Sequence, residues 1–346
     1  MRTAVVSDLH LGSRMRMDLL RRPGIRARLV AALRDVDELV LLGDAFELRD
    51  STLRDAVAQA QPCLEELGDA LRGRTVVIVP GNHDHRLAWE ALGLARPRRR
   101  RGLGLCALAP PPRRGPLAGI RAALGTEVRV AYPGYWVRDG IWATHGHYLD
   151  TCSAAPTLEN VASVVLRPVR APVRHARRPG DFEAALWPTY GVFHAIAQRR
   201  ALRPLADRGK LTVRAAERAA ERGHRIALGA PRSGTGPGEL RRPGVRPLAR
   251  VLELLRVDAE HVLFGHTHRT GPVEGDDMRA WVTAAGTALH NTGSWVYEPA
   301  YVAGCDAGSP YWPGTVTLVQ EGRPPRRLRL LAEPQDAHQP GEEADG

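Results

Sequence analysis

Residues Val262-Leu263-Phe264-Gly265-His266-Thr267-His268 join a short apolar run to two histidines that are separated by one residue. On a β-strand this spacing places both imidazole rings on one face, and on a loop just beyond a strand it can direct both rings to one place. Taken alone, the pair is explained equally well by two ordinary surface or core histidines. The interpretation therefore depends on whether other parts of the chain supply polar residues in the same way.

Four further short clusters of Asp, Asn and His each follow an apolar run that is typical of a buried strand. They are Ser7-Asp8-Leu9-His10, Gly43-Asp44-Ala45-Phe46-Glu47, Gly81-Asn82-His83-Asp84 and Thr144-His145-Gly146-His147. Strands are predicted at 3–6, 37–42, 75–79, 127–131 and 137–144, with helices at 24–34 and 52–72. The opening alternation of strand and helix predicts an α/β domain, whose sheet places site residues at the carboxyl ends of its strands.

The composition is that of a globular protein with a large core, since 43% of the 346 residues are hydrophobic. A formal net charge of +11 would suit a nucleic acid, an anionic membrane surface or an anionic substrate. Almost all of the positive charge is arginine, and Lys210 is the only lysine. So strong a bias, beside abundant Ala, Gly, Pro and Leu, indicates genome base composition and reduces the weight that charge alone can carry.

Cysteine usage and the absence of targeting signals bear on the compartment. The cysteines are far apart and form no CxxC pair, so we expect free thiols in a reducing compartment: Cys63, Cys106, Cys152 and Cys305. The chain enters a strand at Thr3 without a signal-peptide pattern, and no apolar run reaches about 18 residues. These features predict a cytoplasmic protein without a transmembrane segment, and they leave peripheral membrane contact open.

The predicted core consists of residues 1–150 and 246–331, with a helix at 246–256. Residues 96–119 carry two Arg/Pro-rich runs and are predicted to form a surface loop with little regular structure. Residues 332–346 are acidic and are predicted to be a disordered tail. The sheet is predicted to end in antiparallel strands near 279–285, 300–303, 314–320 and 326–331.

Residues 151–245 differ in character from the rest of the chain. Helical patterns lie near 157–167, 181–201 and 211–222, and they are mixed with arginine and proline. The segment is predicted to be a helical insertion, which either packs on the core or covers a site as a lid.

The five clusters hold ten candidate site residues: Asp8, His10, Asp44, Asn82, His83, Asp84, His145, His147, His266 and His268. Mn²⁺, Fe²⁺ and Zn²⁺ accept a mixture of carboxylate and imidazole ligands. Two such ions about 3.5–4 Å apart, joined by a carboxylate, hold both the attacking and the leaving oxygen of a phosphoryl displacement. Five such clusters, each after a strand, would rarely arise together by chance.

In these motifs and their order, the sequence resembles the calcineurin-like metallophosphoesterase superfamily, whose pattern is DxH, GDxx(D/E), GNH(D/E), HG and GHxH. The resemblance implies a four-layer α/β/β/α sandwich with a helical cap insertion, and two divalent metal ions, with Mn²⁺ first and Fe²⁺ or Zn²⁺ as alternatives. It implies that one ion is held by Asp8, His10, Asp44 and His268. It implies that the other is held by Asp44, Asn82, His145 and His266, so that Asp44 bridges the two.

The resemblance also implies roles in the reaction. A hydroxide between the metals attacks phosphorus in line, while His83 lies near the leaving-group oxygen and either donates a proton or holds charge. Asp84 is expected to orient the His83 ring, and its alternative role is to cap the following helix. His147 is assigned to substrate binding, with a place behind the ligands or a structural role as alternatives, and Glu47 is expected to be structural. Three glycines are expected to let backbone and ligands approach the metals: Gly43, Gly81 and Gly265.

A narrower resemblance concerns the substrate. The Gly43–Glu47 motif, the insertion and Asn291-Thr292-Gly293-Ser294-Trp295 are similar to the UDP-2,3-diacylglucosamine pyrophosphatase branch, whose cap receives acyl chains. Arginine in the insertion would then bind phosphates. The chain departs from that branch at His83, where the branch has arginine, and its composition suggests a genome type that can lack this lipid pathway. We therefore expect a small or lipid-linked phosphoester, which is a phosphodiester, a pyrophosphate or a phosphomonoester.

Three other classes compete with this hypothesis. A nuclease of the same superfamily is favoured by the charge, but no heptad run predicts the coiled coil that its usual relatives need. A non-catalytic interaction scaffold is disfavoured because every expected ligand is present. A protein Ser/Thr phosphatase has no support, because the pattern beyond the ligands is similar to the small bacterial branch.

Overall fold

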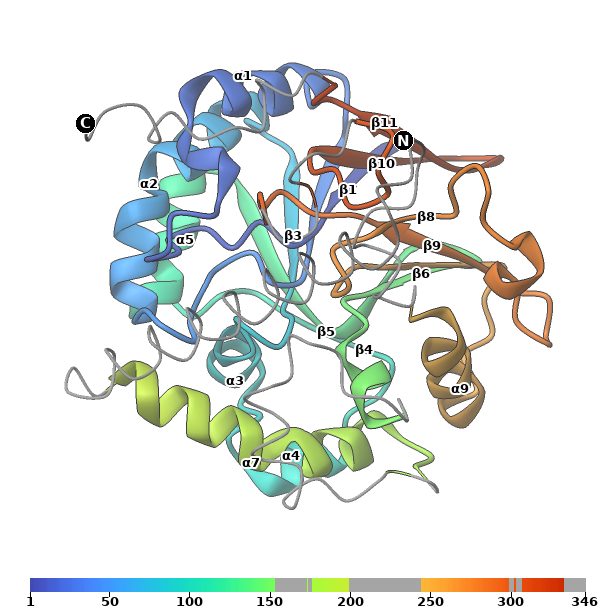
Figure 1. Ribbon diagram of the computed structural model, residues 1–346. Helices are drawn as coiled ribbons and strands as arrows, with labels where there is room; N and C mark the ends of the chain where they lie inside the picture. The colour runs from blue at the N-terminus through green and yellow to red at the C-terminus, as the bar shows by residue number, and fades with distance from the viewer. Residues whose placement is uncertain (153–172, 174–175, 199–243, 299–301, 303–306, 333–346) are drawn as a thin grey trace, which may run out of the picture.

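The computed structural model describes residues 1–152, 173, 176–198, 244–298, 302 and 307–332 of the chain. Within these ranges one mixed sheet of 11 strands runs in the order β11-β10-β1-β2-β3-β5-β6-β7-β9-β8, and β4 pairs with β5 (Figure 1). In its first half, parallel neighbours are β1 (Arg2–Val6), β2 (Glu38–Leu42), β3 (Thr75–Val79) and the start of β5 (Glu127–Arg138). Antiparallel to β1 lies β10 (Thr315–Gln320), followed by β11 (Arg323–Arg329).

The long strand β5 carries the sheet into its second half. There β6 (Ile141–Thr144) pairs antiparallel with β5, while β7 (His261–Phe264) and β9 (Ala288–Thr292) continue in parallel. The short β8 (Thr270–Gly271) closes this edge by antiparallel pairing with β9.

Alternate residues of the strands face two different cores, as the period of a β-strand requires. In β2, Leu39 and Leu41 belong to a cluster beneath helices, whereas Val40 and Leu42 belong to a second cluster that also contains Leu263 from β7. The second cluster therefore lies between the two halves of the sheet, which pack face to face.

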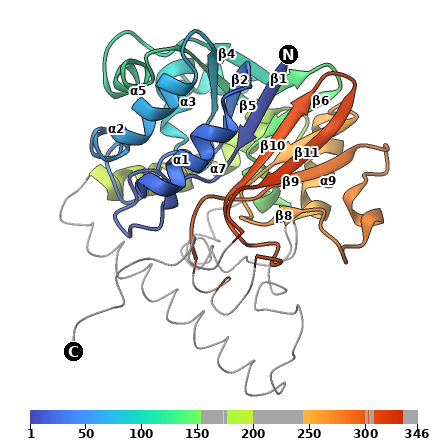
Figure 2. The same ribbon diagram turned by 90° about the horizontal axis from the view of Figure 1, so that it is seen from above.

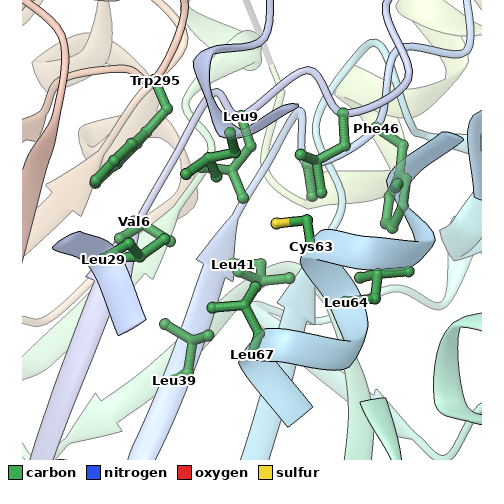
Figure 3. Packing of buried hydrophobic residues seen from close by; sticks show 14 of the residues in the cluster. Val6, Leu9, Leu29, Leu39, Leu41, Phe46, Cys63, Leu64, Leu67 and Trp295 are labelled. Carbon is green, nitrogen blue, oxygen red and sulfur yellow. The ribbon is translucent and has the colours of Figure 1, made fainter. Parts of the chain in front are cut away.

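Helices cover the outer face of each half (Figure 2). The first half is covered by α1 (Pro23–Ala32), α2 (Leu53–Ala70) and α5 (Pro116–Leu124), and the second by α9 (Val245–Leu255) and the short η7 (Met278–Trp281). Figure 3 shows Leu64 and Leu67 of α2 packed over the strand residues Leu39 and Leu41. The predicted α/β/β/α order of layers is confirmed.

The prediction of an irregular loop over residues 96–119 is wrong. This segment contains α4 (Pro97–Arg101), β4 (Cys106–Ala109) and the start of α5. Proline stands at the first position of both helices, where its missing N–H costs nothing and its fixed φ suits a helix. The edge strand β4 forms because β5 offers it an antiparallel partner, which local sequence does not reveal.

Two predictions about strands also need correction. The two strands predicted at 127–131 and 137–144 are β5 and β6, and β5 runs on through Pro133, because that residue lies where pairing passes from β3 and β4 to β6. The strand predicted near 279–285 is replaced by η7, and β9 follows it in parallel, not antiparallel, pairing with β7. The short helix forms where the Asp277 side chain accepts a hydrogen bond from the Arg279 N–H.

Of the predicted insertion, the structure describes one helix, α7 (Pro179–Gln198), close to the predicted 181–201. The helices predicted at 157–167 and 211–222, most of the strand predicted near 300–303 and the acidic tail lie outside the described residues. The helix α7 packs against α4, where the Arg100 guanidinium carbon lies 3.5 Å from the Trp187 ring centre. Cys63, Cys106 and Cys152 are free thiols, as expected, and Cys305 is not described. Among the described helices, none is long and apolar enough to cross a membrane.

Candidate metal centre

Loops at the carboxyl ends of β1, β2, β3, β6 and β7 bring the predicted residues together. The first two loops are joined by backbone hydrogen bonds: the Asp8 N–H donates to the Gly43 carbonyl at 3.0 Å, and the His10 N–H donates to the Asp44 carbonyl at 2.8 Å. The Asp8 carboxylate accepts from the His266 N–H at 3.1 Å, which ties in the loop after β7. The residues of three separate motifs are therefore fixed relative to one another by their backbones.

Five of the predicted ligand residues have left-handed backbone conformations, with φ between 47° and 70°: Asp8, His10, Asp44, His266 and His268. Among the other described residues that are not glycine, only Arg16 and Arg256 share this conformation. Left-handed backbone is costly for residues with a Cβ atom, and such strain tends to gather at functional sites. The strain singles out the same loops that the sequence motifs do.

The three glycines of the motifs allow close approach, as expected. A Cβ atom on Gly43 would overlap the His145 ring, and one on Gly81 would overlap the Asp44 carboxylate. A Cβ atom on Gly265 would overlap Asp8. Each glycine thus leaves room for a predicted ligand from a different loop.

The first group of potential ligands contains Asp8, His10 and His268, whose donor atoms lie within 4.8 Å of one another. The Nε2 atoms of His10 and His268 are 3.3 Å apart, and the His268 Nε2 is 3.3 Å from Asp8 Oδ1. Asp8 Oδ1 is buried and has no hydrogen-bond partner with suitable geometry in the structure. A buried carboxylate oxygen facing two imidazole nitrogens fits a divalent cation, because the cation would satisfy all three atoms.

Carboxylates behind the two histidines fix which nitrogen faces the site. His10 Nδ1 lies 3.1 Å from Glu47 Oε2, and His268 Nδ1 lies 2.7 Å from Glu298 Oε1. A proton on each Nδ1 leaves the Nε2 lone pair directed at the first group, which is the arrangement that metal-binding histidines adopt.

The second group contains Asp44, His145 and His266, again with donor atoms within 4.8 Å. His145 is fully buried, with Nδ1 3.3 Å from the Leu42 carbonyl and Nε2 3.2 Å from Asp44 Oδ2. The Asn82 Oδ1 atom lies 3.0 Å from the same Nε2, so Asn82 joins this group. His266 Nε2 is held by Asp150 at 3.0 Å. The second group therefore brings together the four residues expected at the second ion.

Asp44 belongs to the second group and also approaches His10 of the first. Its Oδ2 atom is 3.9 Å from His10 Nε2, 3.8 Å from His83 Nε2 and 3.2 Å from His145 Nε2. Burial alone would raise the pKa of Asp44, but the nearby rings of His145 and His83 hold it well below the usual value. An ionised carboxylate between two clusters of nitrogen donors has the position that a bridging ligand requires.

His83 lies beside these groups, but the expectation that Asp84 orients its ring is wrong. The His83 Nδ1 atom is 2.9 Å from Glu47 Oε2 instead. The Asp84 oxygens accept from the backbone N–H groups of Ala45 at 2.8 Å and Gly81 at 2.6 Å, so Asp84 joins the loops after β2 and β3. It does not cap the following helix, α3 (Arg86–Leu92), which has no side-chain cap. Glu47, expected to be structural, takes the orienting position because its longer side chain reaches both rings.

The charge states of His83 and Asp84 follow from burial. Burial and then the positive charge of Arg49 lower the pKa of His83 to about 4, so the ring is neutral at pH 7. Burial and the negative charge of Asp44 raise the pKa of Asp84 to about 7. A neutral His83 that donates from Nδ1 to Glu47 presents a bare Nε2 to the site.

His147, assigned to substrate binding, is buried behind the ligands. Only 2% of its surface is exposed, and its Nε2 atom lies 3.1 Å from the Tyr132 hydroxyl. Its ring centre is 5.6 Å from that of His145. This burial favours a place behind the ligands, which was one of the alternatives for His147.

Behind His147, the carboxylate of Glu183 fastens α7 to the core. Glu183 is fully buried, and it accepts hydrogen bonds from the hydroxyls of Tyr132 and Tyr148, at 2.5 and 2.7 Å. Its other oxygen is 2.8 Å from His85 Nε2. Burial would raise the pKa of Glu183, but His85 and the two tyrosines lower it, so the carboxylate is ionised. The helix of the predicted insertion is thus locked beside the site.

Sequence reasoning did not assign the carboxylates that hold the ligand rings: Glu47, Asp150 and Glu298. Glu47 lies within the Gly43–Glu47 motif, and Asp150 lies just after His147. Their closeness in sequence to predicted ligands could have indicated them. Glu298 lies 30 residues from His268, and no local pattern marks it.

Comparison with known proteins identifies the kind of site. The sequence profile of calcineurin-like phosphoesterases matches residues 1–270. No curated protein matches the chain. Among solved structures, the chain is similar to the crystal structure of a dimetal phosphatase from Danio rerio, with 11% identity, 96% of this chain and 99% of that chain covered, and a TM-score of 0.37. That score is too low for the neighbour's activity to be carried over.

Proposed function

Because the chain belongs to the calcineurin-like phosphoesterase family, we propose that it is a dinuclear metal-dependent phosphoesterase that hydrolyses a phosphodiester, a pyrophosphate or a phosphomonoester. The observation that carries the proposal is the pair of neighbouring ligand groups, Asp8–His10–His268 and Asp44–His145–His266, with Asp44 Oδ2 3.9 Å from His10 Nε2 of the first group. The orphaned oxygen of Asp8 and the Nε2 atoms of His10 and His268, which lie 3.3 Å apart, support a cation at the first position. Asp44 is the proposed bridge between the two positions.

The donor set suits two divalent ions, with Mn²⁺ as the first choice and Fe²⁺ or Zn²⁺ as alternatives. The first would be held by Asp8, His10, Asp44 and His268, and the second by Asp44, Asn82, His145 and His266. When bound, the ions would supply a hydroxide nucleophile at neutral pH and neutralise charge on the phosphoryl oxygens.

His83 is the proposed proton carrier for the leaving alcohol. Its Nδ1 hydrogen is held by Glu47, so a second proton on the ring must sit on Nε2, which faces the site. Because the ring is neutral at pH 7, Nε2 must first accept a proton from water. The carboxylate of Glu47 stabilises the imidazolium that forms, and Nε2 then passes this proton to the departing oxygen.

The proposal is tested with purified protein, Mn²⁺ and two chromogenic substrates, bis(p-nitrophenyl) phosphate and p-nitrophenyl phosphate. We expect hydrolysis that is lost with a chelator and restored by Mn²⁺, and loss of both activity and bound metal in Asp44→Ala and His266→Ala. Asp69→Ala is the matched control, because Asp69 pairs with Arg72 on the surface. Full activity in Asp44→Ala would contradict the proposed mechanism. A panel of phosphodiesters, monoesters and nucleotide-diphosphate sugars then identifies the substrate class.

A further inference from the structure

A narrow slot of about 30 Å³ opens beside the candidate metal centre, between α3 and α7. Its walls include Arg49, Asn82, His83, Trp89, Tyr190 and Phe193. Two of these residues belong to the motif after β3, and two belong to α7, so the slot joins the candidate site to the described part of the insertion. A group that enters the slot therefore lies next to His83, the proposed proton carrier.

Arg49, which lines this slot, has a buried donor without an acceptor. Its Nε atom is buried and has no hydrogen-bond partner, and its guanidinium forms no ion pair with any residue in the described ranges. A buried N–H group without an acceptor costs free energy, and almost all such groups in proteins find a partner. The described part of the chain therefore supplies no acceptor for this N–H group, and we expect a ligand to supply it.

The ring of Phe193 fixes the direction of that donor group. The guanidinium carbon of Arg49 lies 4.5 Å from the Phe193 ring centre, which is the distance of a cation–π contact. The other arginine of the slot, Arg86, differs because its guanidinium is paired with Glu90 at 2.8 Å. Of the two, only Arg49 is held on an aromatic face with its charge uncompensated.

We propose that Arg49 binds a phosphoryl oxygen of the phosphoester, and that Phe193 of α7 holds the guanidinium in the orientation needed. A guanidinium is planar and offers paired N–H donors that match two oxygens of a phosphate. Arg49 lines the same slot as Asn82 and His83, which belong to the candidate site. This inference rests on the proposed function, and it assigns part of the substrate site to the insertion.

The test uses the full-length Mn²⁺-loaded protein and the variants Arg49→Gln, Arg49→Lys and Phe193→Leu. Binding of inorganic phosphate is measured by titration calorimetry, and kcat and KM are measured for p-nitrophenyl phosphate. Arg100→Gln is the matched control, because Arg100 also stacks on an aromatic ring of α7 but lies outside the slot. Thermal melting of each variant reports whether α7 packing has changed.

We expect Arg49→Gln to weaken phosphate binding by about tenfold or more and to raise KM by a similar factor, with a smaller change in kcat. Arg49→Lys should recover part of the lost phosphate affinity, because lysine keeps the positive charge but lacks the paired N–H donors of the guanidinium. Phe193→Leu should lie between these variants, and Arg100→Gln should stay within about twofold of the wild type.

The inference is overturned if Arg49→Gln binds phosphate as tightly as the wild type, if the wild type binds no phosphate, or if Arg100→Gln loses as much as Arg49→Gln. If Arg49→Gln binds phosphate as tightly as an active wild type, Arg49 is not part of the substrate site, and the phosphoesterase proposal still holds. Conversely, phosphate binding that depends on Arg49 in a protein without turnover would keep the anion site and remove the proposed reaction.

Discussion

Glu47 lies 2.9 Å from the Nδ1 atom of His83, through the same carboxylate oxygen that lies 3.1 Å from the Nδ1 atom of His10. One oxygen therefore positions a proposed metal ligand and the proposed proton carrier together. The other oxygen accepts from the backbone N–H of Arg49 at 3.0 Å, which fixes the backbone of the proposed anion-binding residue. A single carboxylate couples three proposed functions.

Replacing Glu47 tests this coupling. Glu47→Gln keeps the size of the side chain but removes the charge that supports a protonated His83, so we expect kcat at saturating Mn²⁺ to fall about 10- to 100-fold. Mn²⁺ affinity should fall as well, because the His10 ring loses its anchor. The control is Glu66→Gln, whose carboxylate pairs with Arg26 away from the site. Unchanged kcat and metal affinity in Glu47→Gln would contradict the positioning role.

The carboxylates behind the other two rings separate the two metal positions. Glu298→Gln loosens His268 in the first group, and Asp150→Asn loosens His266 in the second. We expect each change to weaken one of two Mn²⁺ binding steps by about 10- to 100-fold and to leave the other step nearly unchanged. Titration calorimetry resolves the two steps. If both variants weaken the same step, the ligand assignment is wrong.

Gly43→Ala should be far more damaging than a glycine substitution of similar backbone conformation elsewhere. Gly43 has φ 79° and Gly73 has φ 75°, but only at Gly43 would the new methyl group overlap a side chain, the ring of His145. Gly73→Ala should cost about 1–2 kcal/mol of unfolding free energy and keep full activity. Gly43→Ala should lose activity and metal binding in addition. If the two substitutions change the free energy of unfolding and the activity equally, backbone strain alone, and not the overlap with the His145 ring, decides the outcome.

The strands and the polar clusters that follow them could be predicted because both leave local signals, whereas the four layers and the ligand assignment were implied by the family resemblance. Buried strands such as Glu38–Leu42 are apolar on both faces, and each ends in a cluster with a fixed motif. The edge strand β4 and the switch of β5 from one neighbour to the other depend on partners far along the chain, which a local pattern does not contain. The partner of His83 was missed for a related reason, since the adjacent Asp84 is drawn to backbone N–H groups and Glu47 reaches over from another loop.

A pH dependence is expected far from the candidate site, at the paired histidines of β7 and β9. His290 Nε2 lies 3.1 Å from His261 Nδ1, and burial, His261 and Arg327 together lower the pKa of His290 to about 4. Below its ordinary pKa of about 6.5 the unfolded chain binds a proton that the folded chain refuses. Folding stability should therefore fall as pH drops from 6.5 towards 4, by roughly 3 kcal/mol, and should then level off.

The measurement compares wild type with His290→Gln by urea unfolding at several pH values, with a chelator present so that metal binding does not contribute. The free energy of unfolding of the variant, relative to wild type, should rise as pH falls through this window. Parallel curves for the two proteins would mean that His290 does not titrate as its surroundings indicate.

The left-handed backbone at Asp8, His10, Asp44, His266 and His268 has a consequence for how this chain can change under selection. Left-handed backbone costs most residues about 1–2 kcal/mol, aspartate and histidine adopt it at a smaller cost, and glycine and asparagine tolerate it best. A laboratory selection for heat resistance alone, without any demand for turnover, should therefore collect glycine or asparagine at these five positions. The mutations that raise the melting temperature most would then lie at the metal centre, and they would remove its ligands.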